Sequence, residues 1–240
     1  MTMQKINLTA IIVVVLILVG VFAIFYLYQS GQDKATVSAT GNFETKVAPD
    51  EALVYLLIQT KGSSAEQVKN ENARISDDVL TALIKVGLER KDIETENFNI
   101  YPEYNWTSGE QKIIGYTASN NMKITTKDFK NVGKIIDAAV DNGALVSYIN
   151  FELSIEKNNE YKALVMANAS LDAKHKAESI VAGLGKSVGR IVSVSTSDYY
   201  YRPYPLYTAE AGQDVKTVAT NIQPKSLDIS ATVTVTYEIS

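Results

Sequence analysis

The chain has 240 residues, 23 of them basic and 27 acidic, which gives a formal net charge of −4 at pH 7. It contains no cysteine, which excludes disulfides, thiolate metal sites, a lipid-bearing N-terminal cysteine and a cysteine nucleophile. The net negative charge also argues against nucleic acid as a partner.

A charge-free run near the N-terminus predicts a membrane span. Residues 8–28 contain no charged side chain, and a helix of that length, at about 1.5 Å per residue, crosses the roughly 30 Å hydrocarbon core of a bilayer. The run is longer than the apolar core of a cleaved signal peptide. It ends at Tyr26 and Tyr28, residues that are typical of the membrane interface. We therefore expect an uncleaved, single-pass anchor in the cell membrane.

The charges that flank this span set its expected orientation. Lys5 precedes it, whereas Asp33 balances Lys34 after it, so the positive-inside rule places the N-terminus in the cytoplasm. The C-terminal domain then lies outside the cytoplasm. The expected organisation is a cytoplasmic tail 1–7, a transmembrane anchor 8–28, a linker 29–35 and an extracytoplasmic domain 36–240.

The outer domain opens with two β-rich runs, 36–47 and 52–60, on either side of Pro49-Asp50. Pro and Asp are strong turn formers, so this pattern predicts a first hairpin. Ser63 and Ser64 then supply caps for an amphipathic helix, whose apolar residues recur every three or four positions up to Gly87.

A second block of strands and a helix follows. Alternating apolar residues predict strands at 98–104, 114–124 and 149–155. Helical spacing between the last two begins at Asp128 and stops at Asn142-Gly143. The order from 52 to 155 is thus strand, helix, strand, strand, helix, strand, which is typical of the split βαβ arrangement of ferredoxin-like folds.

The C-terminal part adds a third helix and two strands. Asn158 or Asn159 is expected to cap a long helix that runs to Gly185. Strands are expected at 190–196 and 227–239, with a long polar loop between them. The predicted fold class is therefore α+β: an N-terminal transmembrane helix, then a domain with a ferredoxin-like βαββαβ core, a long third helix and extra C-terminal strands.

Five short segments form an ordered set along the outer domain. They are Val37-Ser38-Ala39-Thr40-Gly41, Ala48-Pro49-Asp50-Glu51-Ala52, Ile114-Gly115-Tyr116-Thr117-Ala118, Ala173-Lys174-His175-Lys176-Ala177-Glu178 and Gly183-Leu184-Gly185-Lys186-Ser187-Val188-Gly189. In this order they resemble the SIMPL-domain family, formerly a domain of unknown function, over about residues 36–240. The resemblance implies an exported or envelope-associated α+β protein that assembles into ring-like or channel-like oligomers, and it carries over no catalytic residues, since none is defined for the family.

Two glycine motifs suggest nucleotide binding, but their context argues against it. Gly183-x-Gly185-x-x-x-Gly189 resembles a dinucleotide fingerprint, and Gly185-Lys186-Ser187 resembles the end of a phosphate loop. Both motifs need a strand before them and a helix after them, whereas here a helix precedes and a strand follows. We interpret these glycines as a helix stop.

No catalytic or metal-binding constellation emerges from the polar residues. His175 is the only histidine, and it is expected on the polar side of a helix, where a catalytic triad is not formed. Glu152, Glu156 and Glu160 are expected to face solvent around a half-buried strand. We therefore predict no catalytic residue, no cofactor site and no metal site.

The most unusual local feature is a cluster of tyrosines. The candidate interface residues are Tyr199, Tyr200, Tyr201, Arg202, Tyr204 and Tyr207. Tyr and Arg are enriched at interfaces, which predicts contact with a second subunit, an envelope protein or a glycan. The alternative is that these rings fold back over the domain's own sheet as a lid. Asn105, in Asn105-Trp106-Thr107, is the better candidate for glycosylation.

The leading functional hypothesis is a membrane-anchored binding or assembly module that forms homo-oligomers and has no catalytic activity. Exposed strand edges favour pairing with another chain, and a shared membrane surface raises the effective concentration of its copies. The alternatives are an envelope sensor or transporter accessory protein that binds a small ligand, and an envelope hydrolase that uses carboxylates, hydroxyls and His175.

Overall fold

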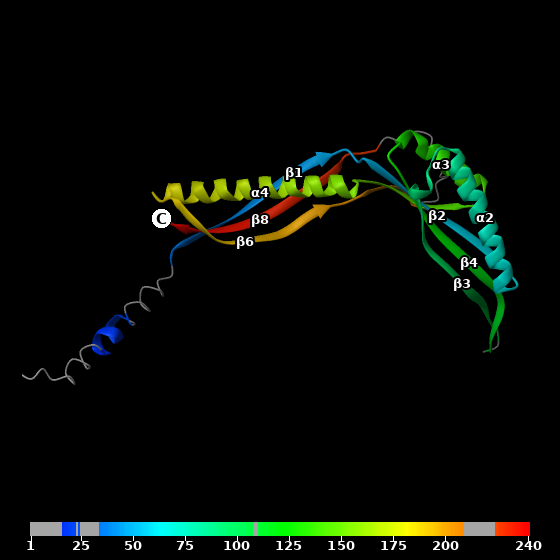
Figure 1. The fold of residues 1–240 in the computed structure, drawn as a ribbon, viewed down its shortest axis with the longest axis horizontal. Helices are drawn as coiled ribbons and strands as arrows, with labels where there is room; N and C mark the ends of the chain where they lie inside the picture. Colours follow the sequence, from blue (N-terminus) through cyan, green and yellow to red (C-terminus); the bar gives the residue numbers. More distant parts are fainter. Residues whose placement is uncertain (1–15, 23, 25–33, 108–109, 209–223) are drawn as a thin grey trace, which may run out of the picture.

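The protein consists of two antiparallel sheets, each covered by helices on one face, joined end to end in an elongated molecule (Figure 1). The computed structural model describes residues 16–22, 24, 34–107, 110–208 and 224–240. The helices are α2 (Ala65–Lys85), α3 (Val132–Asp141) and α4 (Ile155–Gly183), with short 3-10 turns at Arg90–Asp92 and Phe129–Asn131. The strands are β1 (Thr36–Val47), β2 (Glu51–Gly62), β3 (Ile93–Thr107), β4 (Glu110–Thr126), β5 (Leu145–Glu152), β6 (Val188–Tyr201), β7 (Tyr204–Thr208) and β8 (Leu227–Ile239).

The protein is α+β, but the predicted fold is wrong in beginning with a membrane-spanning helix. Of the predicted span 8–28, the structure describes 16–22 and 24 as helix, and the other positions lie outside the described residues, as do the tail 1–7 and most of the linker. Among the described residues no helix is long and apolar enough to cross a membrane.

The three-stranded sheet has the order β1-β8-β6, and α4 lies along one face of it. β1 and β8 pair over their full length, from Thr36 opposite Glu238 to Val47 opposite Leu227. The predicted hairpin between β1 and β2 is therefore wrong. β2 pairs instead with β4 and β5, so the two strands lie in different sheets.

The five-stranded sheet has the order β3-β4-β2-β5-β7, and α2 and α3 both cover the same face (Figure 1). Residues 51–152 run strand, helix, strand, strand, helix, strand, and β7 adds a fifth strand beside β5. α2 begins after the N-cap Ser64 and ends before Gly87, as the capping pattern predicts. Val54, Leu56 and Ile58 of β2 are fully buried beneath the helices.

α4 starts earlier than its sequence pattern predicts. β5 ends at Glu152, and the N-cap of α4 is Ser154 rather than Asn158 or Asn159. The Ser154 hydroxyl accepts from the backbone N–H of Lys157 at 3.3 Å and donates to the carboxylate of Asp50 at 2.7 Å. The contact with Lys157 is a local N-cap that the periodicity argument missed, whereas the contact with Asp50 joins residues that are distant in sequence.

The two sheets enclose separate hydrophobic cores. In the three-stranded part, the buried face of α4 is a stripe of small residues spaced by four. Its members are Val165, Ala169, Ala173, Ala177 and Val181. Their size lets the helix approach β1 closely at Gly41, where a Cβ atom would overlap the carbonyl oxygen of Ala169 and the backbone nitrogen of Ala173.

We expect Gly41→Ala to destabilise the protein by about 1–3 kcal/mol, because the added methyl forces α4 away from β1. Chemical denaturation of the full chain measures this change. Gly183→Ala is the matched control: a Cβ there meets nothing within 4 Å, so its free energy of unfolding should stay the same or rise slightly. Equal stability of both variants would contradict the close packing at Gly41.

Candidate functional site

The tyrosine cluster lies where the chain crosses from one sheet to the other. β6 ends at Tyr201 in the three-stranded sheet, and β7 begins at Tyr204 in the five-stranded sheet. Tyr204 pairs with Phe151 of β5, and Tyr207 pairs with Ile149. The segment predicted as the start of a polar loop therefore forms two strands, and positions 209–223 of that loop lie outside the described residues.

Two of the tyrosines turn inward against α4. Tyr199 and Tyr201 are partly buried against the core of the three-stranded sheet. The Tyr199 hydroxyl donates to the side-chain oxygen of Asn158, and the Lys162 ammonium lies 5.3 Å from the centre of its ring. The Tyr201 hydroxyl accepts from the backbone N–H of Leu153 at 2.7 Å. Burial raises the pKa of both hydroxyls, that of Tyr201 to about 12.

Tyr200 points the other way and is 48% exposed. The guanidinium carbon of Arg202 lies 5.8 Å from the centre of its ring, within the range of a cation–π contact. Side-chain alternation along β6 thus divides the cluster. The rings of Tyr199 and Tyr201 pack against the core, whereas Tyr200 and Arg202 are exposed to solvent.

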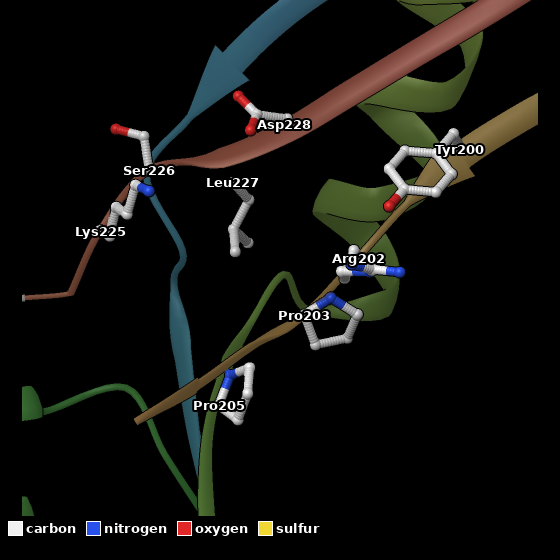
Figure 2. Close-up of a pocket in the computed structure, with 8 residues that line it drawn as sticks. All are labelled: Tyr200, Arg202, Pro203, Pro205, Lys225, Ser226, Leu227 and Asp228. Carbon is white, nitrogen blue, oxygen red and sulfur yellow. The ribbon is translucent and has the colours of Figure 1, made fainter. Parts of the chain in front are cut away.

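A pocket of about 610 Å³ opens beside Tyr200 and Arg202. It is lined by Tyr200, Arg202, Pro203, Pro205, Lys225, Ser226, Leu227 and Asp228. Figure 2 shows Ser226 and Lys225 across from the Arg202-Pro203 link, with Leu227 between them. Its volume falls within the range of about 300–1,000 Å³ typical of small-ligand sites.

The pocket combines apolar walls with two cations. Asp228 lies 4.0 Å from Lys46, whereas no ion pair engages Arg202 or Lys225 within the part of the chain that the structure describes. The prolines, Leu227 and the Tyr200 ring supply apolar surface. Chemically, this arrangement suits an anionic group attached to an apolar body.

Hydrogen bonds fix the junction that holds this pocket. The Asp50 carboxylate accepts from the backbone N–H of Ser154 at 2.8 Å as well as from its hydroxyl, and the Asp50 N–H donates to the carbonyl of Glu152 at 3.1 Å. With the Leu153–Tyr201 bond, these contacts link three crossings between the sheets. The sequence pattern predicted only a turn-forming role for Asp50. The available signal was Ser154, a good helix-capping residue placed at the end of a predicted strand.

The second exposed feature is the outer edge of β6. β6 is an edge strand of the order β1-β8-β6, and α4 lies over β1 and β8. Ile191, Val192 and Val194 are 58%, 52% and 55% exposed. Three register shifts interrupt its pairing with β8.

The remaining residues singled out from the sequence do not converge on one site. His175 lies on α4 beside Ser38 and Thr40 of β1, in a shallow groove. Gly185 has φ of 69° just after α4, which is the geometry of a helix stop. Asn105 is exposed near the end of β3.

The three carboxylates singled out from the sequence occupy different settings. Glu152 is half-buried in β5, Glu156 opens α4, and Glu160 pairs with Lys157 at 2.7 Å. In the described ranges no group of three or more His, Cys, Asp or Glu side chains is arranged to hold a metal ion.

Comparison with known proteins defines the class. Residues 37–237 match the SIMPL family, described as "Protein of unknown function (DUF541)", and the chain belongs to this family. It is 30% identical over 203 residues to the 26 kDa periplasmic immunogenic protein of Brucella melitensis, covering 80% of this chain and 79% of that one. The uncharacterized protein YggE of Edwardsiella ictaluri is 22% identical over 85% of this chain and 87% of its own, and YggE of Escherichia coli K12 is 21% identical over 72% and 70%.

We expect Tyr201→Phe to lower the free energy of unfolding by about 1–3 kcal/mol, because the backbone N–H of Leu153 loses its acceptor in a partly buried place. Tyr200→Phe, one position away and exposed, should change it by less than about 0.5 kcal/mol. Parallel denaturation curves of the two variants provide the measurement. A larger loss for Tyr200→Phe would show that the inward and outward rings are assigned the wrong way round.

Proposed function

We propose that this protein is an extracytoplasmic binding and assembly module that associates with further copies of itself along the free edge of β6. Family membership supports the assignment, since the name of the Brucella melitensis relative places that protein in the periplasm. The observation that carries it is the exposed aliphatic edge of β6, described above.

The central part of the β6 edge has neither charged residues nor proline. Natural edge strands are commonly blunted by charged residues or proline, yet 191–196 contains neither. The opposite edge, β1, carries Glu44 and Lys46. Among the described strands, β6 pairs only with β8, so its outer edge combines free backbone groups with apolar side chains, which together favour pairing with another strand.

A two-fold, antiparallel pairing of β6 with β6 of a second copy fits this edge best. In an isologous dimer the same patch lies on both sides, so Ile191, Val192 and Val194 would meet their own counterparts. The register shifts along β6 increase the local twist, which opposes unlimited stacking of sheets. The expected product is a closed assembly rather than a fibre.

We expect Val192→Lys and Val194→Lys to reduce the mass of the full chain in solution, as measured by light scattering on a sizing column, while leaving thermal stability unchanged. Charges on an edge strand oppose strand pairing without entering the core. Leu171→Lys is the matched control, since Leu171 is 53% exposed on α4. A monomeric wild-type chain at tens of micromolar, or an equal effect of the α4 variant, would contradict the proposal.

Disulfide trapping locates the contact. Because the chain has no cysteine, a single cysteine placed in turn at positions 190–196 reports proximity to its own copy. We expect cross-linked dimers to peak near Val192 and to be absent for Leu171→Cys. Cross-linking that peaks instead at α4 would move the interface away from β6.

The junction pocket supports a second candidate, an envelope accessory protein that binds a small ligand. Its support is the volume of the pocket together with the cations Arg202 and Lys225, which form no ion pair with any of the described residues. We expect benzoate to raise the melting temperature of the full chain and neutral benzyl alcohol to leave it unchanged, since binding to the folded state alone stabilises it. The effect should vanish in Arg202→Ala; a shift that survives this change would argue against the pocket.

A further inference from the structure

The five-stranded sheet has one face that none of the described helices covers. α2 and α3 lie on the same side (Figure 1), where Val54, Leu56 and Ile58 of β2 are buried. Tyr55, which alternates with them, points to the opposite face and is half-buried. This face is separate from the edge of β6, which belongs to the other sheet, and from the junction pocket.

A stacked pair of tyrosines lies on this uncovered face. Tyr55 of β2 lies directly opposite Tyr148 of β5, and their rings are stacked with centroids 3.9 Å apart and planes at 18°. The strand pairing is irregular at two places nearby. β5 has an extra residue, Ser147, next to Tyr148, and β3 has an extra residue, Glu96. Such bulges redirect side chains and are frequent next to functional sites.

A cavity of about 290 Å³ lies between these two bulges. It is lined by Tyr55, Leu56, Glu96, Asn97, Asn121, Ser147 and Tyr148. Its walls combine aromatic surface with amide, hydroxyl and carboxylate groups from four neighbouring strands. The volume is near the lower end of known ligand sites, which limits the occupant to a small molecule with a single ring.

Three polar side chains of the lining have unused hydrogen-bonding groups. Asn97 of β3 and Asn121 of β4 lie directly opposite each other, and Ser147 comes from the bulge in β5. Within the part of the chain that the structure describes, none of the three side chains makes a hydrogen bond. Each amide carries two donors and one acceptor oxygen, and the serine hydroxyl can act as either. The cavity therefore offers donors and acceptors side by side.

A cation already lies among the carboxylates around this cavity. Lys123 of β4 lies opposite Tyr55 and pairs with Glu94 at 2.7 Å. The hydrogen bond to Glu94 raises the pKa of the Lys123 ammonium, and the charges of Glu96 and Glu152 add to the rise. A charged occupant would lie close to a group of its own sign whichever sign it carried. The site thus favours a neutral molecule that forms hydrogen bonds.

We propose that this cavity binds a neutral sugar through a single pyranose ring. The hydroxyls of a sugar both donate and accept, which complements the amides of Asn97 and Asn121 and the hydroxyl of Ser147. The Glu96 carboxylate accepts from a further hydroxyl. The C–H groups of the ring lie against the tyrosine pair, since aromatic surface supplies apolar contact while a few polar groups fix the orientation of a ligand.

The probe is methyl β-D-glucopyranoside, titrated into the full chain and followed by chemical shifts. Saturable changes should cluster at Asn97, Asn121, Ser147 and Tyr148. Tetrahydropyran-2-methanol keeps the ring but lacks the ring hydroxyls, so it should not bind. Glucosamine and glucuronate carry opposite charges on the same ring, and neither should bind more tightly than the neutral sugar.

Cellotetraose distinguishes two sources of the ring. Affinity equal to that of the monosaccharide supports recognition of the end of a glycan chain. Weaker binding of the tetrasaccharide supports a free sugar as the ligand, because only one ring fits the cavity.

A matched pair of variants tests the amide contacts. Asn97→Ala should weaken the sugar about fivefold, the loss expected for one hydrogen bond. Asn99→Ala is the control, because Asn99 is exposed on the same face of β3, two positions further along, and does not line the cavity. Its affinity should equal that of the unmodified chain.

The tyrosine pair is tested separately from the amides. Tyr148→Phe keeps the ring and should retain sugar binding, whereas Tyr148→Leu removes the aromatic wall and should weaken it. Thermal melts of both variants establish that they are folded before titration.

Four results would overturn the proposal: no saturable shift with the sugar, equal binding of tetrahydropyran-2-methanol, equal weakening by Asn97→Ala and Asn99→Ala, or tighter binding of either charged sugar. The second indicates a site for apolar rings, and the last indicates that charge governs the cavity. None of them bears on association through β6, because β6 belongs to the other sheet.

Discussion

Side-chain alternation in β1 and β2 gives each strand one apolar face, and the rest of the structure depends on how these two faces are covered. β1 buries its odd-numbered positions, such as Val37 and Ala39, whereas β2 buries even-numbered ones, such as Val54 and Leu56. β1 pairs with β8, and its apolar set packs beneath α4. β2 pairs with β4 and β5, and its apolar set packs beneath α2 and α3. Two sheets, two cores and two groups of covering helices result.

Because the strands are divided between two sheets, the chain crosses the junction between them several times. Each crossing leaves backbone groups outside a regular ladder, and such groups need partners when they are buried. Asp50 and Tyr201 provide them, by accepting from Ser154 and Leu153. The same arrangement turns Tyr200 and Arg202 outward, so the pocket in Figure 2 is a consequence of how the crossing is held.

Among the described residues, three surfaces remain open after both cores are formed: the edge of β6, the junction pocket and the face of the five-stranded sheet opposite α2 and α3. They differ in chemistry: the first is aliphatic, the second is cationic with apolar walls, and the third carries the stacked rings of Tyr55 and Tyr148. The assembly proposed along β6 leaves the other two surfaces accessible. In the described ranges the polar residues nearest these surfaces form no metal-binding group.

The sequence by itself determined the features that depend on neighbours along the chain. Ser64 and Gly87 mark the two ends of α2, because helix capping is a local interaction. Gly143 ends α3 in the left-handed conformation. Alternation of buried and more exposed residues identifies β8 over its whole length. The ordered motifs also indicated the SIMPL family. The membrane-spanning helix expected from the apolar run at 8–28 was wrong, since no helix among the described residues is long and apolar enough to cross a membrane.

Only the tertiary structure decided which strands pair, where α4 begins, and how the tyrosines divide. β1 pairs with a strand near the opposite end of the chain, Asp50 supports the cap of α4 at Ser154, and the tyrosine cluster is divided between β6 and β7. The Tyr55–Tyr148 stack joins β2 and β5, which are neighbours in the sheet but far apart in the sequence. Such pairings depend on register and burial between distant segments, and a local pattern contains no information on either.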